Sequence, residues 1–405
     1  MSLKSGDWVE VLSKEEILLS LDSEARLEGL PFMPEMLKFT GRKFKVYKRA
    51  HKTCDTATLT GGRQLPNGIH LDLRCDGSAH GGCQAACLLF WKEAWLKPTT
   101  APATGATDTE SESPSIDSVK IDSVKIEHFP RRELCSEQNV WNATRSNPYA
   151  SSGEFRYTCQ ATELPHYTTR LRWWNPWQYV EDYRAGNVTL GRLICGLAYA
   201  TYAWSAHPRF RALAPTFDWL YDRFQAVIGG IPFPRRYGVI PPGHPAPHSD
   251  LDLRPGELVR VKSYAEILAT LDTTNKNAGL FFDAEMVPFC GHVFRVKDRV
   301  HQFIDEKSGR MSHLKTPAVI LDKVWCQARY SSCRVFCPRS IFSWWREVWL
   351  ERVTESLQDG HPALVSLTDS DSEPEQGEPN RVRPAARTDS PSPIRHPMGL
   401  GDASA

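Results

Sequence analysis

The sequence lacks several features that would point directly to a function. Its 49 Lys and Arg residues nearly balance its 48 Asp and Glu residues, so the formal net charge of +1 gives no overall attraction to nucleic acid or to an anionic membrane. The motifs H-E-x-x-H, G-x-x-x-x-G-K-[ST] and G-x-S-x-G are absent, so the usual sequence marks of zinc proteases, P-loop proteins and α/β-hydrolases are missing. An enzyme is therefore the less favoured class.

The chain also has no apolar run of the roughly 20 residues that a membrane-spanning helix needs. Its longest apolar stretch, residues 193–204, is typical of a buried helix. No apolar segment follows Met1, which predicts a cytoplasmic protein without a secretory signal. In such a protein, an odd count of 11 cysteines indicates metal ligands and buried thiols rather than a disulfide framework.

One stretch of the chain occurs twice, since residues 3–55 align with residues 253–305 without a gap. Each copy opens with an alternating strand and continues with a capping box, Ser13-x-x-Glu16 or Ser263-x-x-Glu266, which predicts the start of a helix. A second alternating strand follows, and each copy ends in an expected closing helix, at residues 92–96 and 346–350, whose Trp pairs should pack into the module. The predicted fold class is α+β, with two homologous small antiparallel modules that resemble SH3 barrels.

The two copies divide the chain into six predicted parts. A Trp-rich unit between them should be helical, because helical spacing occurs at residues 176–184, 190–204 and 217–228. Segments rich in Thr, Ala, Ser or Pro are expected to be linkers or a disordered tail. The predicted parts are a first module (1–97), a flexible linker (98–126), the helical unit (127–236), a Pro-rich linker (237–252), a second module (253–353) and a disordered tail (354–405).

One His and three Cys recur in the same order in both copies. Structural zinc sites are closed by four N or S ligands from the protein, and each copy supplies that number. The sequence therefore predicts two zinc ions, with an iron-sulfur cluster as a less favoured alternative on ligand type. The predicted ligands are His51, Cys75, Cys83 and Cys87 in the first copy and His301, Cys326, Cys333 and Cys337 in the second.

Buried thiols and a core histidine are the alternative interpretation of these residues. Duplication favours the metal-site interpretation, because the one His and three Cys recur in both copies while another cysteine does not. Cys54 of the first copy is matched by Ile304 in the second. Cys54 is expected to be a core residue, with replacement of His51 as a ligand left open. Cys135 and Cys159, which lie between the copies, are likewise expected to be core thiols.

Two further features bear on function. The recurring residues Glu35 and Glu285 are interpreted as caps or surface groups in preference to general bases. A basic run interleaved with aromatic residues could follow phosphates, although a solvated face explains it too. Its candidate contact residues are Arg42, Lys43, Lys45, Lys48, Arg49 and Lys52.

The duplicated pattern resembles bacterial proteins that carry a duplicated His/Cys3 module and have no assigned activity. The resemblance covers both repeats and implies no substrate, cofactor or partner. The sequence thus favours a zinc-binding protein-interaction or scaffolding protein whose partner is a protein. Binding of nucleic acid through residues 38–52 is the alternative, and a metal-dependent enzyme is the third.

Overall fold

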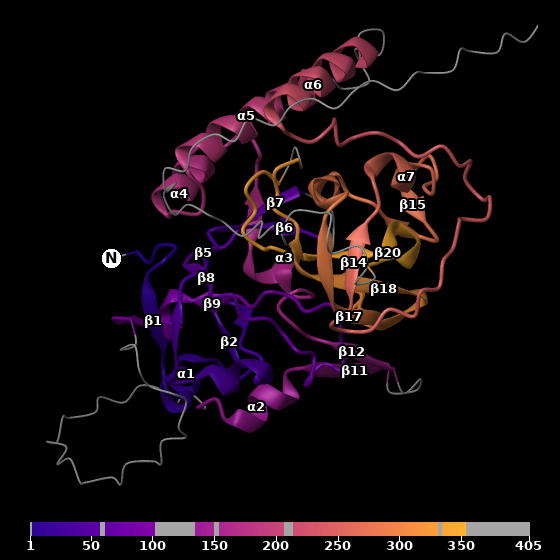
Figure 1. Cartoon of the computed structure of the whole chain (residues 1–405). Helices are drawn as coiled ribbons and strands as arrows, with labels where there is room; N and C mark the ends of the chain where they lie inside the picture. Colours follow the sequence, from indigo (N-terminus) through magenta and orange to yellow (C-terminus); the bar gives the residue numbers. More distant parts are fainter. Residues whose placement is uncertain are drawn as a thin grey trace, which may run out of the picture. The chain divides into compact units, whose positions relative to one another are not determined.

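The structure is a computed structural model that describes residues 2–56, 61–101, 134–149, 154–205, 214–330 and 334–353. These residues form a mixed helix and strand structure with antiparallel sheets of two to five strands (Figure 1). Most of the predicted flexible linker, the predicted tail and Cys333 lie outside the described residues.

The second copy contains the largest sheet of the described residues, with the strand order β19-β18-β17-β14-β20. Its outer strands, β19 and β20, do not pair with each other, so the sheet stays open and the expected SH3-like barrel is not confirmed. The elements of this copy are β14 (Leu258–Val261), α7 (Tyr264–Leu268), β15 (Lys276–Asn277), β16 (Leu280–Phe281), η4 (Ala284–Phe289), β17 (Val293–Ile304), β18 (Met311–Trp325), β19 (Phe342–Trp345), η5 (Glu347–Trp349) and β20 (Leu350–Arg352).

The first copy repeats this arrangement in shorter strands, which form the sheets β10-β1-β4 and β5-β8-β9. Val9 pairs with Phe44 as Val259 pairs with Phe294. Its elements are β1 (Trp8–Val11), α1 (Lys14–Ser20), β2 (Arg26–Leu27), β3 (Leu30–Pro31), η1 (Pro34–Phe39), β4 (Lys43–Lys45), β5 (Lys48–Arg49), β6 (Lys52–Asp55), β7 (Gly61–Gln64), β8 (Gly68–His70), β9 (Trp91–Lys92), η2 (Glu93–Trp95) and β10 (Leu96–Pro98).

Both predicted capping boxes are confirmed. The Ser13 hydroxyl accepts a hydrogen bond from the Glu16 backbone N–H at 3.2 Å, and the Glu16 carboxylate accepts one from the Ser13 N–H at 2.9 Å. Ser263 and Glu266 make the same pair of bonds at 3.3 and 2.9 Å. Each box satisfies two backbone donors that the first turn of a helix leaves unpaired.

The expected closing helix is one 3-10 turn in each copy, η2 and η5, followed at once by a strand. The Trp residue two positions before each turn and the Trp residue that ends it are fully buried, as predicted. Phe32 packs edge-on against Trp95 with ring centroids 5.3 Å apart, and Phe282 packs against Trp349 at the same separation. The same aromatic contact therefore anchors both cores.

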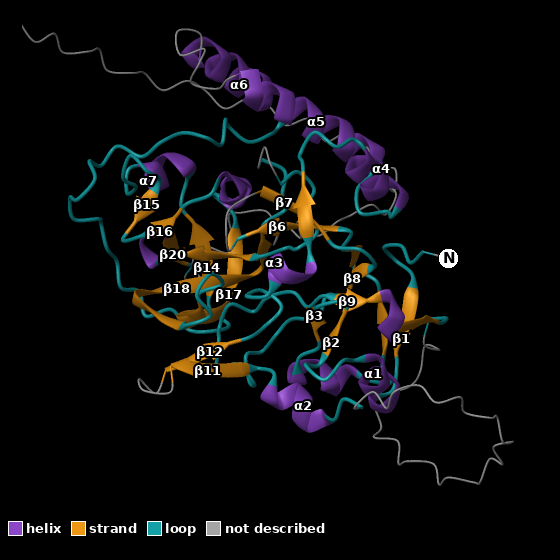
Figure 2. Cartoon of the chain, turned by 180° about the vertical axis from the view of Figure 1, so that it is seen from behind, coloured by secondary structure: helices purple, strands orange, loops and turns teal. Residues whose placement is uncertain are grey.

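The segment between the copies contains the three predicted helices, α4 (Trp177–Arg184), α5 (Leu190–Ser205) and α6 (Ala214–Ile228). It is not purely helical, because β11 and β12 pair with each other (Figure 2) and residues Thr169–Leu171, which form β13, pair with β7 of the first copy. Several of its Trp side chains are exposed, and the predicted helical Trp-rich unit is not confirmed. No described helix is long and apolar enough to cross a membrane. Its other elements are α2 (Glu137–Asn142), β11 (Arg145–Tyr149), β12 (Glu154–Tyr157), α3 (Leu164–Tyr167) and β13 (Thr169–Leu171).

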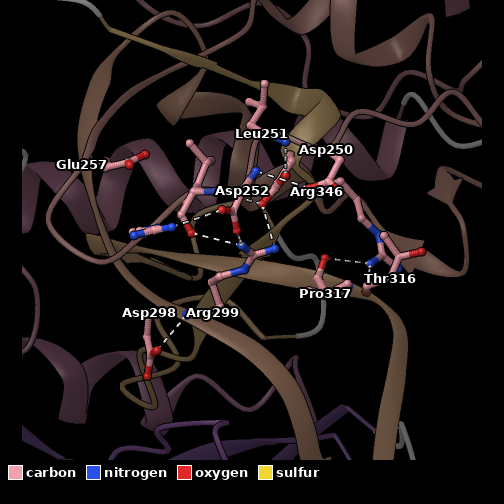
Figure 3. A network of polar contacts seen from close by, with 12 residues as sticks. Asp250, Leu251, Asp252, Glu257, Asp298, Arg299, Thr316, Pro317 and Arg346 are labelled. Atoms are coloured by element: carbon pink, nitrogen blue, oxygen red, sulfur yellow. Dashed lines mark hydrogen bonds and ion pairs between the residues drawn. The ribbon is translucent and has the colours of Figure 1, made fainter.

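A half-buried Arg–Glu ion pair recurs in the two copies and lies next to the residues at which each copy begins. Arg299 pairs with Glu347 at 3.2 Å and with Asp252 at 2.8 Å, in the network that Figure 3 shows around Arg299. At the equivalent place in the first copy, Arg49 pairs with Glu93 and donates to the Leu3 carbonyl at 3.2 Å. Arg49, part of the basic run, is thus also a structural residue.

Candidate metal centres

Four thiols line one cavity of about 40 Å³ and are called cluster 1. Three belong to the first copy and the fourth follows β12: the members are Cys75, Cys83, Cys87 and Cys159. All four are free cysteines. The backbone N–H of Cys75 donates to the Cys87 carbonyl at 2.9 Å, which holds the chain segments of the first and third cysteines together.

Two sulfur atoms of cluster 1 already accept backbone hydrogen bonds. The Gly77 N–H lies 3.4 Å from Cys75 Sγ, and the Ile304 N–H lies 3.4 Å from Cys83 Sγ. Gly77 has φ +70°, and a Cβ at this position would lie 2.2 Å from the Cys83 carbonyl oxygen. Only glycine fits this turn, which sets the first cysteine beside the second. Hydrogen bonds to sulfur are a means by which proteins support metal-bound thiolates.

A second group of thiols, called cluster 2, contains Cys54, Cys326 and Cys337. It lines a larger cavity, of about 270 Å³. The hydrogen bond between the Cys54 and Cys337 thiols lowers the pKa of Cys54 to about 6 and raises that of Cys337 well above its usual range. Cys333, the remaining predicted ligand, lies outside the described residues.

The loops that carry the two clusters share unusual backbone angles. Gly77 and Ala328, each two residues after the first cysteine of their copy, have φ of 70° and 51°. Ala86 and Phe336, each directly before the last cysteine, have φ of 48° and 59°. Such angles are costly for residues other than glycine and persist where the surrounding structure enforces them. The two copies therefore hold their cysteines in the same kind of loop.

A buried carboxylate supports each loop, as the cap interpretation of Glu35 and Glu285 requires. Glu35 Oε1 accepts the Ala79 N–H at 3.0 Å, and Glu285 Oε2 accepts the Arg329 N–H at 3.0 Å. Both donors lie just after the first cysteine of the copy. Each glutamate therefore satisfies backbone donors that the loop between the first and second cysteines would otherwise bury unpaired.

Within the described residues, Glu35, Cys75 and His80 are the group of three whose ligand atoms all lie within 4.8 Å of one another. His80 Nδ1 is 2.7 Å from Glu35 Oε1, and Nε2 is 3.0 Å from the Thr158 carbonyl oxygen. Burial opposes ionisation of Glu35, but the hydrogen bond and charge interaction with His80, together with backbone hydrogen bonds, hold the pKa of Glu35 below its ordinary value. Both ring nitrogens of His80 are engaged in these contacts, which connect the loop to η1 and to the segment after β12. Sequence reasoning missed this residue, although it lies between Cys75 and Cys83.

The two predicted histidine ligands line neither cysteine cavity. His51 Nε2 lies 3.2 Å from the Gln178 carbonyl and 3.3 Å from Asp182 Oδ1, both on α4. Burial lowers the pKa of His51 to about 3, so the ring is neutral. His301 is exposed, and its backbone N–H donates to Gln84 Oε1 at 2.7 Å. The structure thus brings predicted cysteines together and places both histidines elsewhere.

The six candidate phosphate contacts differ in exposure. Arg42, Lys43 and Lys45 are exposed, and Lys48 is half-buried. Arg49 is buried against Glu93, and Lys52 is buried against Asp182 of α4. A cationic face in this region is therefore limited to four of the six residues, Arg42, Lys43, Lys45 and Lys48.

The chain was also compared with known proteins. No protein-family model matches it, and no curated protein matches it.

Proposed function

We propose that this chain is a zinc-binding protein-interaction or scaffolding protein with two structural metal sites. The observation that carries the proposal is that those recurring cysteines that the structure describes line two cavities, each with an additional thiol. Thiolates are preferred ligands of zinc, and structural zinc sites are built from four protein groups with no open position. Zinc would stabilise modules whose sheets stay open.

A structural role is favoured over catalysis by the groups around cluster 1. A catalytic site needs a base or nucleophile that is free to reach a substrate. Both ring nitrogens of His80 have hydrogen-bond partners, and Glu35 Oε1 accepts from His80 and from the Ala79 backbone. These contacts support the loop and leave His80 without a free nitrogen for proton transfer.

Chelation distinguishes the structural role from an enzymatic one. Treating the purified chain with a strong zinc chelator should release two ions. The near-ultraviolet circular dichroism signal of the buried Trp residues should be lost at the same time, because structural zinc supplies folding free energy. A zinc-sensitive dye would count the released ions in the same sample. Release of both ions from a chain that keeps its tertiary signal would contradict the structural role and favour the metal-dependent enzyme.

Nucleic-acid binding is the second candidate, supported by the exposed cations of β4. The Arg42 guanidinium lies 5.5 Å from the Phe44 ring centroid, an arrangement that could accompany phosphate contact. Filter binding of single-stranded RNA and DNA should then show retention at about 50 mM salt that weakens by about tenfold or more at 200 mM. The double variant Lys43→Gln/Lys45→Gln should reduce retention at low salt. No retention of the wild type at low salt would exclude this candidate.

A further inference from the structure

The ends of two equivalent strands are exchanged between the copies. Ile304, at the end of β17, donates its backbone N–H to Cys83 Sγ of the first copy. Its counterpart Cys54, in β6, packs in one cluster with Cys326 and Cys337 of the second copy and lines the same cavity. β6 accordingly lies beside second-copy segments (Figure 1), and Arg339 donates to the Cys54 carbonyl at 3.2 Å.

The contact at the centre of this exchange is between equivalent residues. Thr56 and Glu306 occupy matching positions of the two copies, and the Thr56 hydroxyl donates to the Glu306 carboxylate. In a two-fold arrangement, equivalent residues meet at the axis and every other contact occurs twice. The pairing of each strand end with the other copy's cysteine loop is therefore reciprocal.

This exchange leaves the clusters unequal, because cluster 1 receives Ile304 where cluster 2 receives Cys54. Cys159 supplies a thiol to cluster 1 instead. Its neighbour Gln160 accepts the Phe90 N–H at 2.8 Å and donates to the Phe90 carbonyl at 2.8 Å, three residues beyond Cys87. The Cys159 backbone N–H is held by Thr162 Oγ1 at 2.9 Å. These contacts hold the backbone around Cys159 beside the cavity that Cys159 lines.

We propose that a cysteine from outside the repeat takes part in each metal site: Cys159 is a ligand at the cavity that Cys75, Cys83 and Cys87 line, and Cys54 is a ligand at the cavity that Cys326 and Cys337 line. His51 and His301 are not ligands. The inference rests on the proposed function, since it names the ligands of the same two sites. Its consequence is that each zinc ion ties together segments distant in the sequence. His80, the nearest nitrogen ligand to cluster 1, already has an acceptor at each ring nitrogen.

Zinc X-ray absorption on the wild-type full chain tests the ligand type without any variant. Zinc–sulfur bonds are about 2.3 Å and zinc–nitrogen bonds about 2.0–2.1 Å. The expected spectrum has a sulfur shell and no imidazole contribution. About one imidazole per zinc would overturn the inference while leaving two structural ions in place. A chain purified without zinc would instead overturn the proposed function.

Native mass spectrometry of variants tests the exchange itself. Cys159→Ser and Cys54→Ser should each retain one ion, whereas His51→Ala and His301→Ala should retain two. Cys135→Ser is the matched control, since Cys135 is a buried thiol between the copies that lines neither cavity, and it should retain two.

Paired substitutions identify which site Cys54 serves. Cys54→Ser/Cys337→Ser removes two ligands of one site and should retain one ion, whereas Cys54→Ser/Cys87→Ser affects both sites and should retain none. The opposite pattern, with no ion for the first pair and one for the second, would show that Cys54 serves its own copy. If the variants do not fold, the wild-type absorption spectrum still decides between thiol and histidine ligands.

Discussion

Replacing Cys83 with serine (Cys83→Ser) is expected to leave one zinc ion per chain instead of two and to unfold the cysteine loops of the first copy. The effect should be large, because structural zinc in small peptides binds with an apparent free energy of about 10–16 kcal/mol at neutral pH. Cys83 contributes a sulfur that lies at the cavity and accepts the Ile304 N–H. Its loss therefore removes a ligand and a contact between the copies.

The measurement combines a zinc count with limited proteolysis, which should cut the loop around residues 76–86 in the variant. Cys195→Ser serves as the control, because Cys195 is an exposed thiol on α5. The control should keep both ions and the wild-type digestion pattern. A Cys83→Ser chain that keeps two ions would show that Cys83 is not a ligand.

A second large loss of stability is expected when Lys52 is replaced by methionine (Lys52→Met). Lys52 is buried, pairs with Asp182 of α4 and donates to the Val335 carbonyl at 2.9 Å. Its removal leaves the Asp182 carboxylate buried without its cation, and such losses cost about 3–5 kcal/mol. The free energy of unfolding in urea, measured on zinc-loaded protein, should fall by this amount.

Lys43→Met is the matched control, since Lys43 is exposed on β4 and its replacement should change stability by less than about 0.5 kcal/mol. The double variant Lys52→Met/Asp182→Asn should recover part of the loss, because it removes the uncompensated charge. Equal stability of the Lys52 and Lys43 variants would contradict the structural role assigned to this ion pair.

Local features of this chain could be read from its sequence. The capping boxes at Ser13 and Ser263 depend on residues three positions apart, and both form as predicted. The helices α4, α5 and α6 follow the spacing of their apolar residues. Burial of the paired Trp residues was also predicted, although the short turn that carries them could not be distinguished from a helix by spacing alone.

The partners of the cysteines could not be read in the same way. Alignment of the copies pairs Cys54 with Ile304, which favours a core role for Cys54 over a ligand role, but an alignment does not show that the two strand ends are exchanged. His51 recurs with His301, yet its ring contacts α4, an element that has no counterpart in the alignment. Cys159 is supplied from outside both repeats, so no internal comparison could identify it.

Elemental analysis of the purified full-length chain tests the central claim most directly. The protein should contain about two zinc ions per chain, lose them only together with its fold, and regain both when zinc is returned to the unfolded chain. A fully folded, metal-free chain with all of its thiols free would contradict the claim that the two cysteine clusters are structural zinc sites.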